Sequence, residues 1–432
     1  MDLMKELLRK AEQVEIINLQ NETTTVTFEA NQLKSCRVAE TKGTSVRVVR
    51  DGRMGFAASS DERAVTKLAS NVLESANYGD QLTFNFPAAQ PAAQVRTFDR
   101  KIVDLSISRL VEIGREVLDL ILPVEPEASV NINLKRSVQS ASLKNQTGLD
   151  IQFKSSPLAF ELEIDRIVGD DVLIIFDIVG TTEWDEDYLG FARQLVKKLK
   201  MARILTSMRS GNMPVLFSPS GSLALGLPVK EGLNGKNVYK GTSPMRGKIG
   251  EKLFDEKLTM IDDGTLHGRP GSAPYDDEGV PHQRNLLVDK GVLKGFFYDL
   301  RTAARFGVTS TGNATRSLFT QPEPASSNFM IQPGNTPLKD MIASIREGIL
   351  VEGLLGLGQG NIISGAFSNP LALAFKIENG QIVGRVKDLS IAGNVYDLLK
   401  NVEAVSQETE WVYASIHAPY ILLPQMNVVA KE

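Results

Sequence analysis

The stretch Leu373-Ala-Phe-Lys-Ile-Glu-Asn-Gly-Gln-Ile-Val383 places an Asn379-Gly380 pair between two apolar runs. An Asn-Gly pair readily adopts the positive φ angles of a two-residue hairpin turn, so two antiparallel strands are expected here. The segment 285–298 repeats this design around Asp289-Lys-Gly291, and Asp51-Gly52 separates two further apolar runs. Because hairpins join antiparallel neighbours whereas parallel neighbours need crossover helices, the sequence predicts large, mainly antiparallel sheets.

Amphipathic helices are expected mainly in the first half of the chain. Residues 61–78 and 105–122 each carry an apolar stripe at helical spacing, and Pro123 ends the second stripe. A third helix is expected over residues 186–201, where Lys197 and its neighbours place positive charge near the C-terminal end. The mixture of hairpins and helices predicts an α+β fold.

The length of the chain suggests two domains. A chain of 432 residues exceeds what one ordinary core accommodates. A turn-rich break at 210–214 precedes an apolar strand and predicts the boundary. We therefore expect an N-terminal α/β domain over residues 1–210, in which the helices are concentrated, and a C-terminal β-rich domain over residues 211–432.

Composition argues against several classes of partner. The net charge of -4 supplies no positive field that would attract nucleic acid. The single cysteine, Cys36, excludes an intrachain disulfide and fits a reduced, cytoplasmic setting. The first ten residues have the pattern of an amphipathic helix rather than a secretory signal. The apolar stretch 349–358 is interrupted by Glu352 and falls short of the roughly 20 residues that a membrane-spanning helix needs. We expect no membrane insertion.

Five motifs carry a family resemblance. They are Gly226-Leu-Pro-Val-Lys-Glu231, Gly232-Leu-Asn-Gly-Lys236, Gly247-Lys-Ile-Gly-Glu-Lys-Leu253, Met260-Ile-Asp-Asp-Gly264 and Asp276-Asp-Glu-Gly-Val-Pro281. In this order they resemble the TldD/PmbA family, and most closely its PmbA branch, also called TldE. The resemblance runs along most of the chain, from the hairpin that begins near Gly43 to Met426.

The resemblance also indicates a lost metal site. In the TldD branch an HExxxH helix precedes the same Gly-Leu-x-Gly element, which lays those six positions over residues 226–231. At these degenerate positions, Gly226 and Leu227 lack a donor atom, and only Glu231 could bind a metal. His417 lies where TldD-type chains supply a cysteine ligand to zinc. Because a catalytic zinc needs three protein ligands, we expect neither a metal site nor catalytic residues in this chain.

An acidic cluster invites a second interpretation. The cluster offers hard oxygen ligands that calcium would accept, but its spacing is not that of an EF-hand loop; its members are Asp262, Asp263, Asp276, Asp277 and Glu278. Asp-Asp-Gly and Asp-Glu-Gly are more typical of turns, since aspartate bonds its own backbone and glycine supplies the reversed dihedral. We interpret these residues as positioning elements around a cleft.

A peptide cleft is expected in the C-terminal domain. Strands flanked by glycines, near Asn361 and after Ile377, could accept an extended peptide by edge pairing. The predicted peptide-binding or cleft residues are Glu231, Asp262, Asp263, Asp276, Asp277, Asn361 and His417.

The family has been described as modulators of DNA gyrase and is better understood as a cytosolic metallopeptidase system. The resemblance implies a TldD-type subunit that carries the zinc and a PmbA-type subunit that pairs with it around a chamber for unfolded peptides. This chain is expected in the second role, with no cofactor of its own. Two alternatives stay open. One is a stand-alone metallopeptidase with an atypical site at Glu231 and His417, and the other is a homodimeric peptide-binding or regulatory protein.

Overall fold

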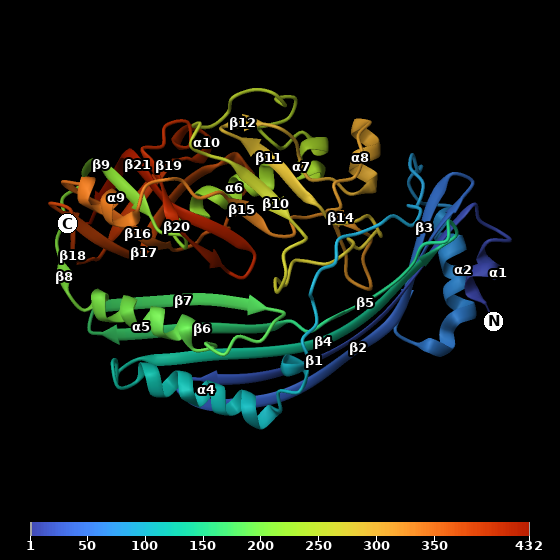
Figure 1. The fold of residues 1–432 in the computed structure, drawn as a ribbon, viewed down its shortest axis with the longest axis horizontal. Coiled ribbons are helices and arrows are strands. Elements are labelled where there is room, and N and C mark those ends of the chain that lie inside the picture. Colours follow the sequence, from blue (N-terminus) through green and yellow to red (C-terminus); the bar gives the residue numbers. More distant parts are fainter. Residues whose placement is uncertain (1, 432) are drawn as a thin grey trace.

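The computed structural model describes residues 2–431 and is built around two large β-sheets (Figure 1). The first is a seven-stranded antiparallel sheet with the order β3-β2-β1-β4-β6-β7, in which β5 pairs with β4. Its strands are β1 (Gln13–Glu29), β2 (Gln32–Arg50), β3 (Arg53–Ser59), β4 (Ser129–Asn145), β5 (Asp150–Ser155), β6 (Leu158–Val168) and β7 (Asp171–Thr181).

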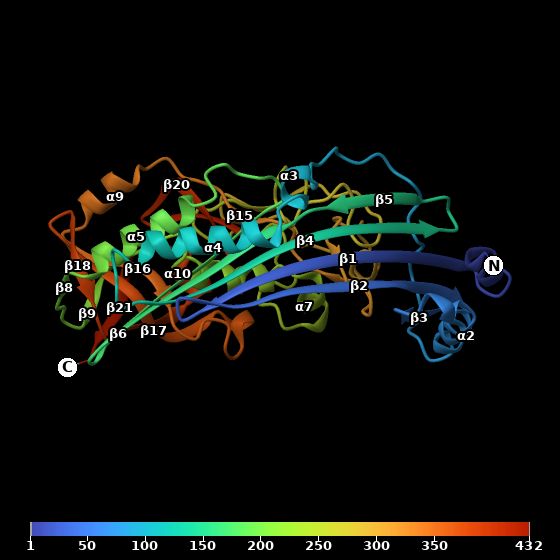
Figure 2. The same cartoon turned by 90° about the horizontal axis from the view of Figure 1, so that it is seen from below.

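Helices cover the two ends of the first sheet. They are α1 (Leu3–Leu7), the 3-10 turn η1 (Glu62–Ala64), α2 (Val65–Ala76), α3 (Arg100–Val103), α4 (Ile107–Ile121) and α5 (Gly190–Ala202). Helices α4 and α5 lie side by side, with α4 against β1 and β4 and α5 against β7, whereas α1 and α2 lie at the far end of the sheet (Figure 2). The apolar stripe predicted for α4 is buried from Leu110 to Ile121. The helix face predicted from the apolar spacing is therefore the face that packs on the sheet.

The second sheet has twelve strands and holds most of the remaining chain. Ten of its strands follow the order β12-β11-β10-β15-β21-β9-β16-β17-β18-β8. Of the other two, β19 pairs with β17 and β21, and β20 pairs with β21. The strands are β8 (Leu205–Thr206), β9 (Gly211–Phe217), β10 (Met260–Asp263), β11 (Arg284–Asp289), β12 (Val292–Leu293), β15 (Phe329–Ile331), β16 (Glu347–Leu354), β17 (Ala366–Glu378), β18 (Gln381–Val386), β19 (Leu389–Asn394), β20 (Ala404–Val412) and β21 (Ile416–Ala430).

Short elements complete this part of the chain. A two-stranded ribbon is formed by β13 (Ala314–Thr315) and β14 (Glu323–Pro324). The helical elements are α6 (Leu223–Gly232), α7 (Gly235–Lys240), α8 (Leu300–Phe306), α9 (Leu338–Ser344), η2 (Ile362–Ser364) and α10 (Val395–Leu398). The three longest helices among the described residues, α2, α4 and α5, precede this part, as predicted.

The predicted hairpins are confirmed, and with them the α+β fold class. Asn379 and Gly380 adopt φ angles of 49° and 76° between β17 and β18. Lys290 and Gly291 form the same turn between β11 and β12, with φ angles of 47° and 79°. Both turns have two successive residues at positive φ, which matches the twist of the flanking strands.

Strand β1 runs unbroken through the polar Asn21 and Glu22, which have ladder partners on both β2 and β4. One element boundary differs from the prediction. The helix predicted over 186–201 begins only at Gly190. Its first residues instead form a turn, in which the backbone N–H of Asp187 donates to Asp185 Oδ1 at 2.8 Å.

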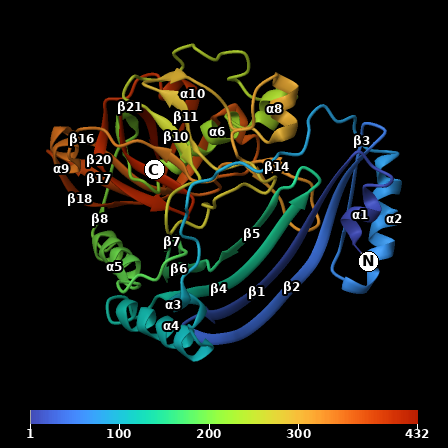
Figure 3. The same ribbon diagram turned by 45° about the vertical axis from the view of Figure 1, so that its right-hand side comes forward.

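The two sheets pack against each other through a shared core (Figure 3). Leu162 on β6 and Ile175 on β7 belong to one buried cluster with Leu350 on β16 and Phe375 on β17. Burial of this apolar surface fixes the first sheet against the second. Within residues 2–431, no helix is both long and apolar enough to cross a membrane.

Candidate functional site

Residues 226–231 fall within helix α6, which is largely buried. Leu225 and Val229 point into the core of the second sheet. Gly226 faces β15, since a Cβ atom built on it would lie 3.8 Å from Ile331 Cδ1. Leu227 and Pro228 instead form part of the wall of a pocket. The segment that resembles a metal-binding helix therefore keeps its helical form and packs with apolar atoms.

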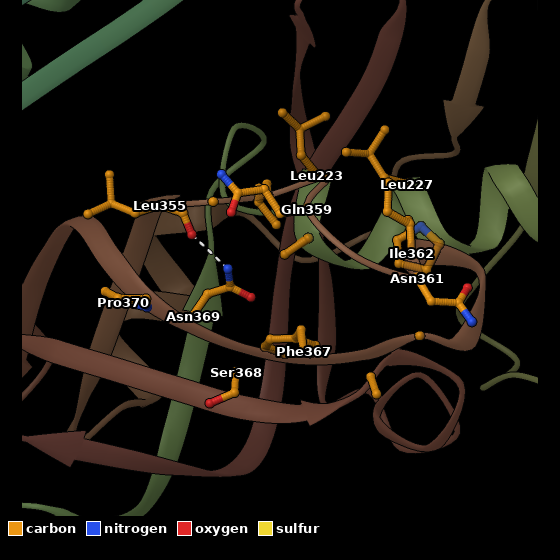
Figure 4. Close-up of a pocket in the computed structure, with 17 residues that line it drawn as sticks. Leu223, Leu227, Leu355, Gln359, Asn361, Ile362, Phe367, Ser368, Asn369 and Pro370 are labelled. Atoms are coloured by element: carbon orange, nitrogen blue, oxygen red, sulfur yellow. Dashed lines mark hydrogen bonds between the residues drawn. The ribbon is translucent and has the colours of Figure 1, made fainter.

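The pocket beside α6 has a volume of about 460 Å³ (Figure 4). One wall is α6, and the others are the loop 355–362 and the start of β17. None of the described residues that line it is charged. The lining residues are Leu223, Ala224, Leu227, Pro228, Leu355, Gly356, Leu357, Gly358, Gln359, Asn361, Ile362, Gly365, Ala366, Phe367, Ser368, Asn369 and Pro370. Of the predicted cleft residues, Asn361 lies here.

The glycine-rich loop is tied to β17 at its first residue. Leu355 donates its backbone N–H to Pro370 O at 2.9 Å and accepts from Asn369 Nδ2 at 2.7 Å. Gly356 and Gly358 have φ angles of 71° and 91°, which a residue with a side chain adopts only with strain. The glycines thus allow the loop to curve around the pocket.

One edge of β17 is open along the pocket. Residues 366–370 pair with β19 on one side, whereas the ladder with β16 on the other side ends at Leu371. Within the described residues, the edge of 366–369 that lies opposite β19 therefore has no ladder partner. Such an edge can accept an extended chain by backbone hydrogen bonding.

Glu231 and His417 lie in different surroundings. Tyr396 on α10 donates its hydroxyl to Pro228 O at 2.9 Å. Burial raises the pKa of Tyr396, and the nearby charge of Glu231 adds to the rise. His417, on β21, packs its ring 4.8 Å from that of Trp411. Burial lowers the pKa of His417, and the neighbouring charge of Arg269 lowers it further. Within residues 2–431, no hydrogen bond or ion pair joins Glu231 to His417.

These residues do not fit a zinc ion. Gly226 has no side-chain donor and Leu227 is apolar. The cation at Arg269 disfavours a second cation beside His417. Across the described residues, no three His, Cys, Asp or Glu side chains are grouped so that they could share a metal. A catalytic zinc requires three such ligands.

The acidic residues hold loops together through backbone hydrogen bonds. Asp276 Oδ1 accepts from the N–H groups of Glu278 and Val280, both at 2.9 Å, and Oδ2 accepts from Ala314 N at 3.0 Å. Asp277 Oδ2 accepts from Arg316 N at 2.8 Å. Burial raises the pKa of both carboxyl groups, and Glu278 adds to the rise at Asp276. These oxygens are already occupied as acceptors.

The first acidic pair acts in the same way. Asp262 Oδ2 accepts from Asn313 Nδ2 at 2.6 Å and from Ser327 Oγ at 2.7 Å. Asp263 Oδ1 accepts from the backbone N–H of Thr265 at 2.9 Å and from its hydroxyl at 2.6 Å. Both carboxylates are buried. The pair therefore positions the segments around residues 313 and 327.

The predicted cleft residues do not form one site. Asp276 and Asp277 line a second pocket of about 310 Å³, together with Phe153 of the first sheet and His282. Burial lowers the pKa of His282 to about 4, so its ring is neutral at physiological pH. Glu231, Asn361 and His417 lie outside this pocket. The sequence pointed to the glycine-flanked strand after Asn361, but it did not show that this strand forms one pocket with Leu227 of α6.

Comparisons with known proteins agree with the motifs. A family model described as the PmbA/TldA metallopeptidase C-terminal domain matches residues 210–430, and one described as PmbA/TldA metallopeptidase domain 1 matches residues 14–76. An uncharacterized protein of Methanocaldococcus jannaschii is 28% identical over 402 residues, which cover 90% of each chain.

Two named proteins are also similar. A protein of Haemophilus influenzae named as a metalloprotease TldD homolog is 33% identical over 222 residues, which cover 51% of this chain and 46% of that protein. The crystal structure of TldE from Thermococcus kodakarensis aligns with a TM-score of 0.89 at 26% identity and covers 99% of both chains.

Proposed function

The chain belongs to the PmbA/TldD metallopeptidase family, as its motifs predicted, and from this premise we propose that it is a noncatalytic, PmbA-type subunit. Its function is to shape the substrate channel of a peptidase whose zinc is carried by a TldD-type partner. The observation that carries the proposal is the apolar setting of α6, in which Gly226 faces Ile331 and offers no donor atom at a position where the TldD branch has a metal ligand.

The proposed substrate is an unfolded peptide. The pocket beside α6 is uncharged and adjoins the open edge of residues 366–369. An extended peptide can pair with such an edge through main-chain hydrogen bonds and place alternate side chains in the pocket. This mode requires no particular sequence, since the backbone is common to all peptides. A folded protein would not present a free strand of this kind.

Purified chain, alone and mixed with its TldD-type counterpart, provides the test. We expect little bound zinc and no cleavage of an unfolded peptide by the chain alone, and chelator-sensitive cleavage by the mixture. The two subunits should also form a stable complex on size-exclusion chromatography. Because the assay measures zinc, binding and cleavage separately, each part of the proposal can fail independently.

Two alternative functions give different outcomes. Zinc-dependent cleavage by the chain alone would establish a stand-alone metallopeptidase and contradict the noncatalytic assignment. A homodimer that binds peptide but does not bind the counterpart would identify a peptide-binding or regulatory protein. If the chain is the noncatalytic subunit, the variants Glu231→Gln and His417→Gln should leave its zinc content unchanged.

A further inference from the structure

Arg269 is a partly buried cation that has no carboxylate partner in the part of the chain that the structure describes. Its Nη2 donates to the backbone oxygen of Ala414 at 3.0 Å, and its guanidinium carbon lies 3.8 Å from the centre of the Trp411 ring. Its Nε is buried and has no hydrogen-bond partner. Within residues 2–431, no carboxylate forms an ion pair with it. Although burial lowers the pKa of Arg269 to about 10, the side chain is charged at neutral pH.

Burying the Arg269 cation without a carboxylate partner lowers the stability of the folded protein when no ligand is bound. A desolvated cation normally pairs with a carboxylate or phosphate, because the low dielectric strengthens both the penalty and the attraction. The fork of an arginine can hold a carboxylate by two parallel hydrogen bonds, and Nε of Arg269 is a buried donor that has no acceptor within residues 2–431. Arg269 therefore has the chemistry of an anion-binding group.

An aromatic pocket adjoins Arg269. It has a volume of about 250 Å³ and lies between β6, β7 and the start of α5. This volume is below the roughly 300 to 1,000 Å³ of pockets for drug-sized ligands, so it suits a single residue. The lining residues are Leu158, Phe160, Val179, Gly180, Thr181, Trp184, Asp185, Asp187, Tyr188, Phe191 and Arg269.

Two carboxylates, those of Asp185 and Asp187, also line this pocket, and both have other partners. Asp185 Oδ1 accepts from the backbone N–H of Asp187 at 2.8 Å. Asp187 forms an ion pair with Arg193. Neither carboxylate pairs with Arg269, so the anion that would complete the site has to come from outside the described chain.

We propose that Arg269 and the aromatic pocket bind the C-terminal residue of a peptide, with its carboxylate on the guanidinium and an aromatic or large aliphatic side chain in the pocket. A chain terminus presents a carboxylate and a side chain on the same carbon, as the adjacent cation and apolar walls require. An Asp or Glu side chain would instead place its carboxylate at the end of the group that enters the pocket.

This site is separate from the pocket beside α6. The two share no lining residue, and Arg269 contacts the turn between β20 and β21 rather than α6. The inference therefore does not rest on the proposed noncatalytic role. It can be tested on the purified full chain without a counterpart subunit.

Tryptophan fluorescence offers a direct measurement, because the chain has only two tryptophans. Trp184 lines the pocket and Trp411 stacks on Arg269. We expect N-acetyl-alanyl-phenylalanine with a free carboxylate to change the emission and to bind at least about tenfold more tightly than the same peptide with a C-terminal amide. Equal affinities for acid and amide, or no binding of either, would overturn the proposal.

Variants locate the binding site. Arg269→Gln should reduce the preference for the acid to within about twofold, whereas the control Arg100→Gln should retain it, since Arg100 pairs only with the exposed Asp104. If Arg269→Gln kept the full preference, the assignment would be wrong. The acid–amide comparison on the unaltered chain decides the question even if this variant does not fold. Tighter binding of 3-phenylpropanoate than of the peptide would also reject a peptide terminus, in favour of a small aromatic acid.

Discussion

Arg47 on β2 donates through Nη1 to Glu278 Oε1 at 2.7 Å, and this buried ion pair joins the first sheet to the segment between β10 and β11. Arg47 also donates to both oxygens of Glu15, at 2.9 Å and 2.7 Å, and Arg316 Nη2 donates to Glu15 Oε1 at 2.8 Å. The four side chains are at most 4% exposed. Two cations and two anions thus balance inside the interface.

The first prediction concerns this network. Arg47→Met should lower the free energy of unfolding by about 3–5 kcal/mol, because Glu278 and one side of Glu15 become buried charges without a partner. The change should appear as a lower midpoint in urea or thermal unfolding. Arg100→Met removes an exposed pair with Asp104 and should cost at most about 1 kcal/mol. Equal effects of the two substitutions would show that the buried network does not hold the first sheet to the segment between β10 and β11.

The second prediction concerns a buried carboxyl group on β7. Burial raises the pKa of Asp177 to about 6, the neighbouring Glu410 and Glu352 add to the rise, and Lys198 opposes it. The native state therefore retains a proton that the unfolded chain loses near its ordinary pKa of 3.8. As the pH rises from about 4 to above 6, the free energy of unfolding therefore falls by roughly 3 kcal/mol.

Asp177→Asn should remove this loss, because the amide does not ionise. The variant should gain thermal stability over the unaltered chain at about pH 8 and much less at about pH 4. The measurement is the difference in Tm between variant and parent at the two pH values. Asp170→Asn, at a side chain that is 99% exposed, serves as the control and should show no such dependence. A constant difference at both pH values would argue against a raised pKa.

Local signals in the sequence predicted local structure well. The Asn379-Gly380 turn is encoded by two residues whose backbone preferences suffice, so the hairpin followed directly. Strand β1 includes the polar Asn21 and Glu22, because pairing with two neighbouring strands holds it together regardless of side-chain polarity. The α6 pocket combines Leu227 with residues 366–370, which are far apart in the chain, so no local pattern could reveal it. The position of Arg269 against Trp411 and Ala414 likewise depends on tertiary packing, since these residues are far apart in the chain.

The third prediction tests the pocket beside α6. Leu227→Trp should fill part of the cavity and reduce peptide cleavage by the mixture with a TldD-type subunit by about tenfold, a loss of about 1.4 kcal/mol in binding. The unfolding free energy should change by less than about 1 kcal/mol, since the pocket has room for the larger ring. Leu205→Trp, at an exposed position on β8, is the matched control. Undiminished cleavage with Leu227→Trp would remove this pocket from the peptide path.

The fourth prediction separates a structural role from calcium binding at the acidic turn. Asp276→Ala leaves three backbone N–H groups without an acceptor and should lower the unfolding free energy by about 3 kcal/mol or more. Asp276→Asn keeps one oxygen acceptor, so its unfolding free energy should lie between that of Asp276→Ala and that of the unaltered chain. Calcium should leave the Tm of the unaltered chain unchanged, because the carboxylate oxygens already accept hydrogen bonds. A rise in Tm on adding calcium would instead indicate a cation site.

The fifth prediction returns to the position that a histidine would occupy in the zinc-binding branch of the family. Gly226 lies in α6, and an added Cβ would make an ordinary contact with Ile331 at 3.8 Å. Gly226→Ala should therefore raise the unfolding free energy by up to about 1 kcal/mol, through better helix propensity. Gly226→His must place a whole imidazole against the buried β15 and should instead lower it by about 1–3 kcal/mol. Thermal unfolding of the two variants with and without zinc measures both effects. A histidine variant as stable as the alanine variant, or one stabilised by zinc, would mean that the metal position is still accommodated in this chain.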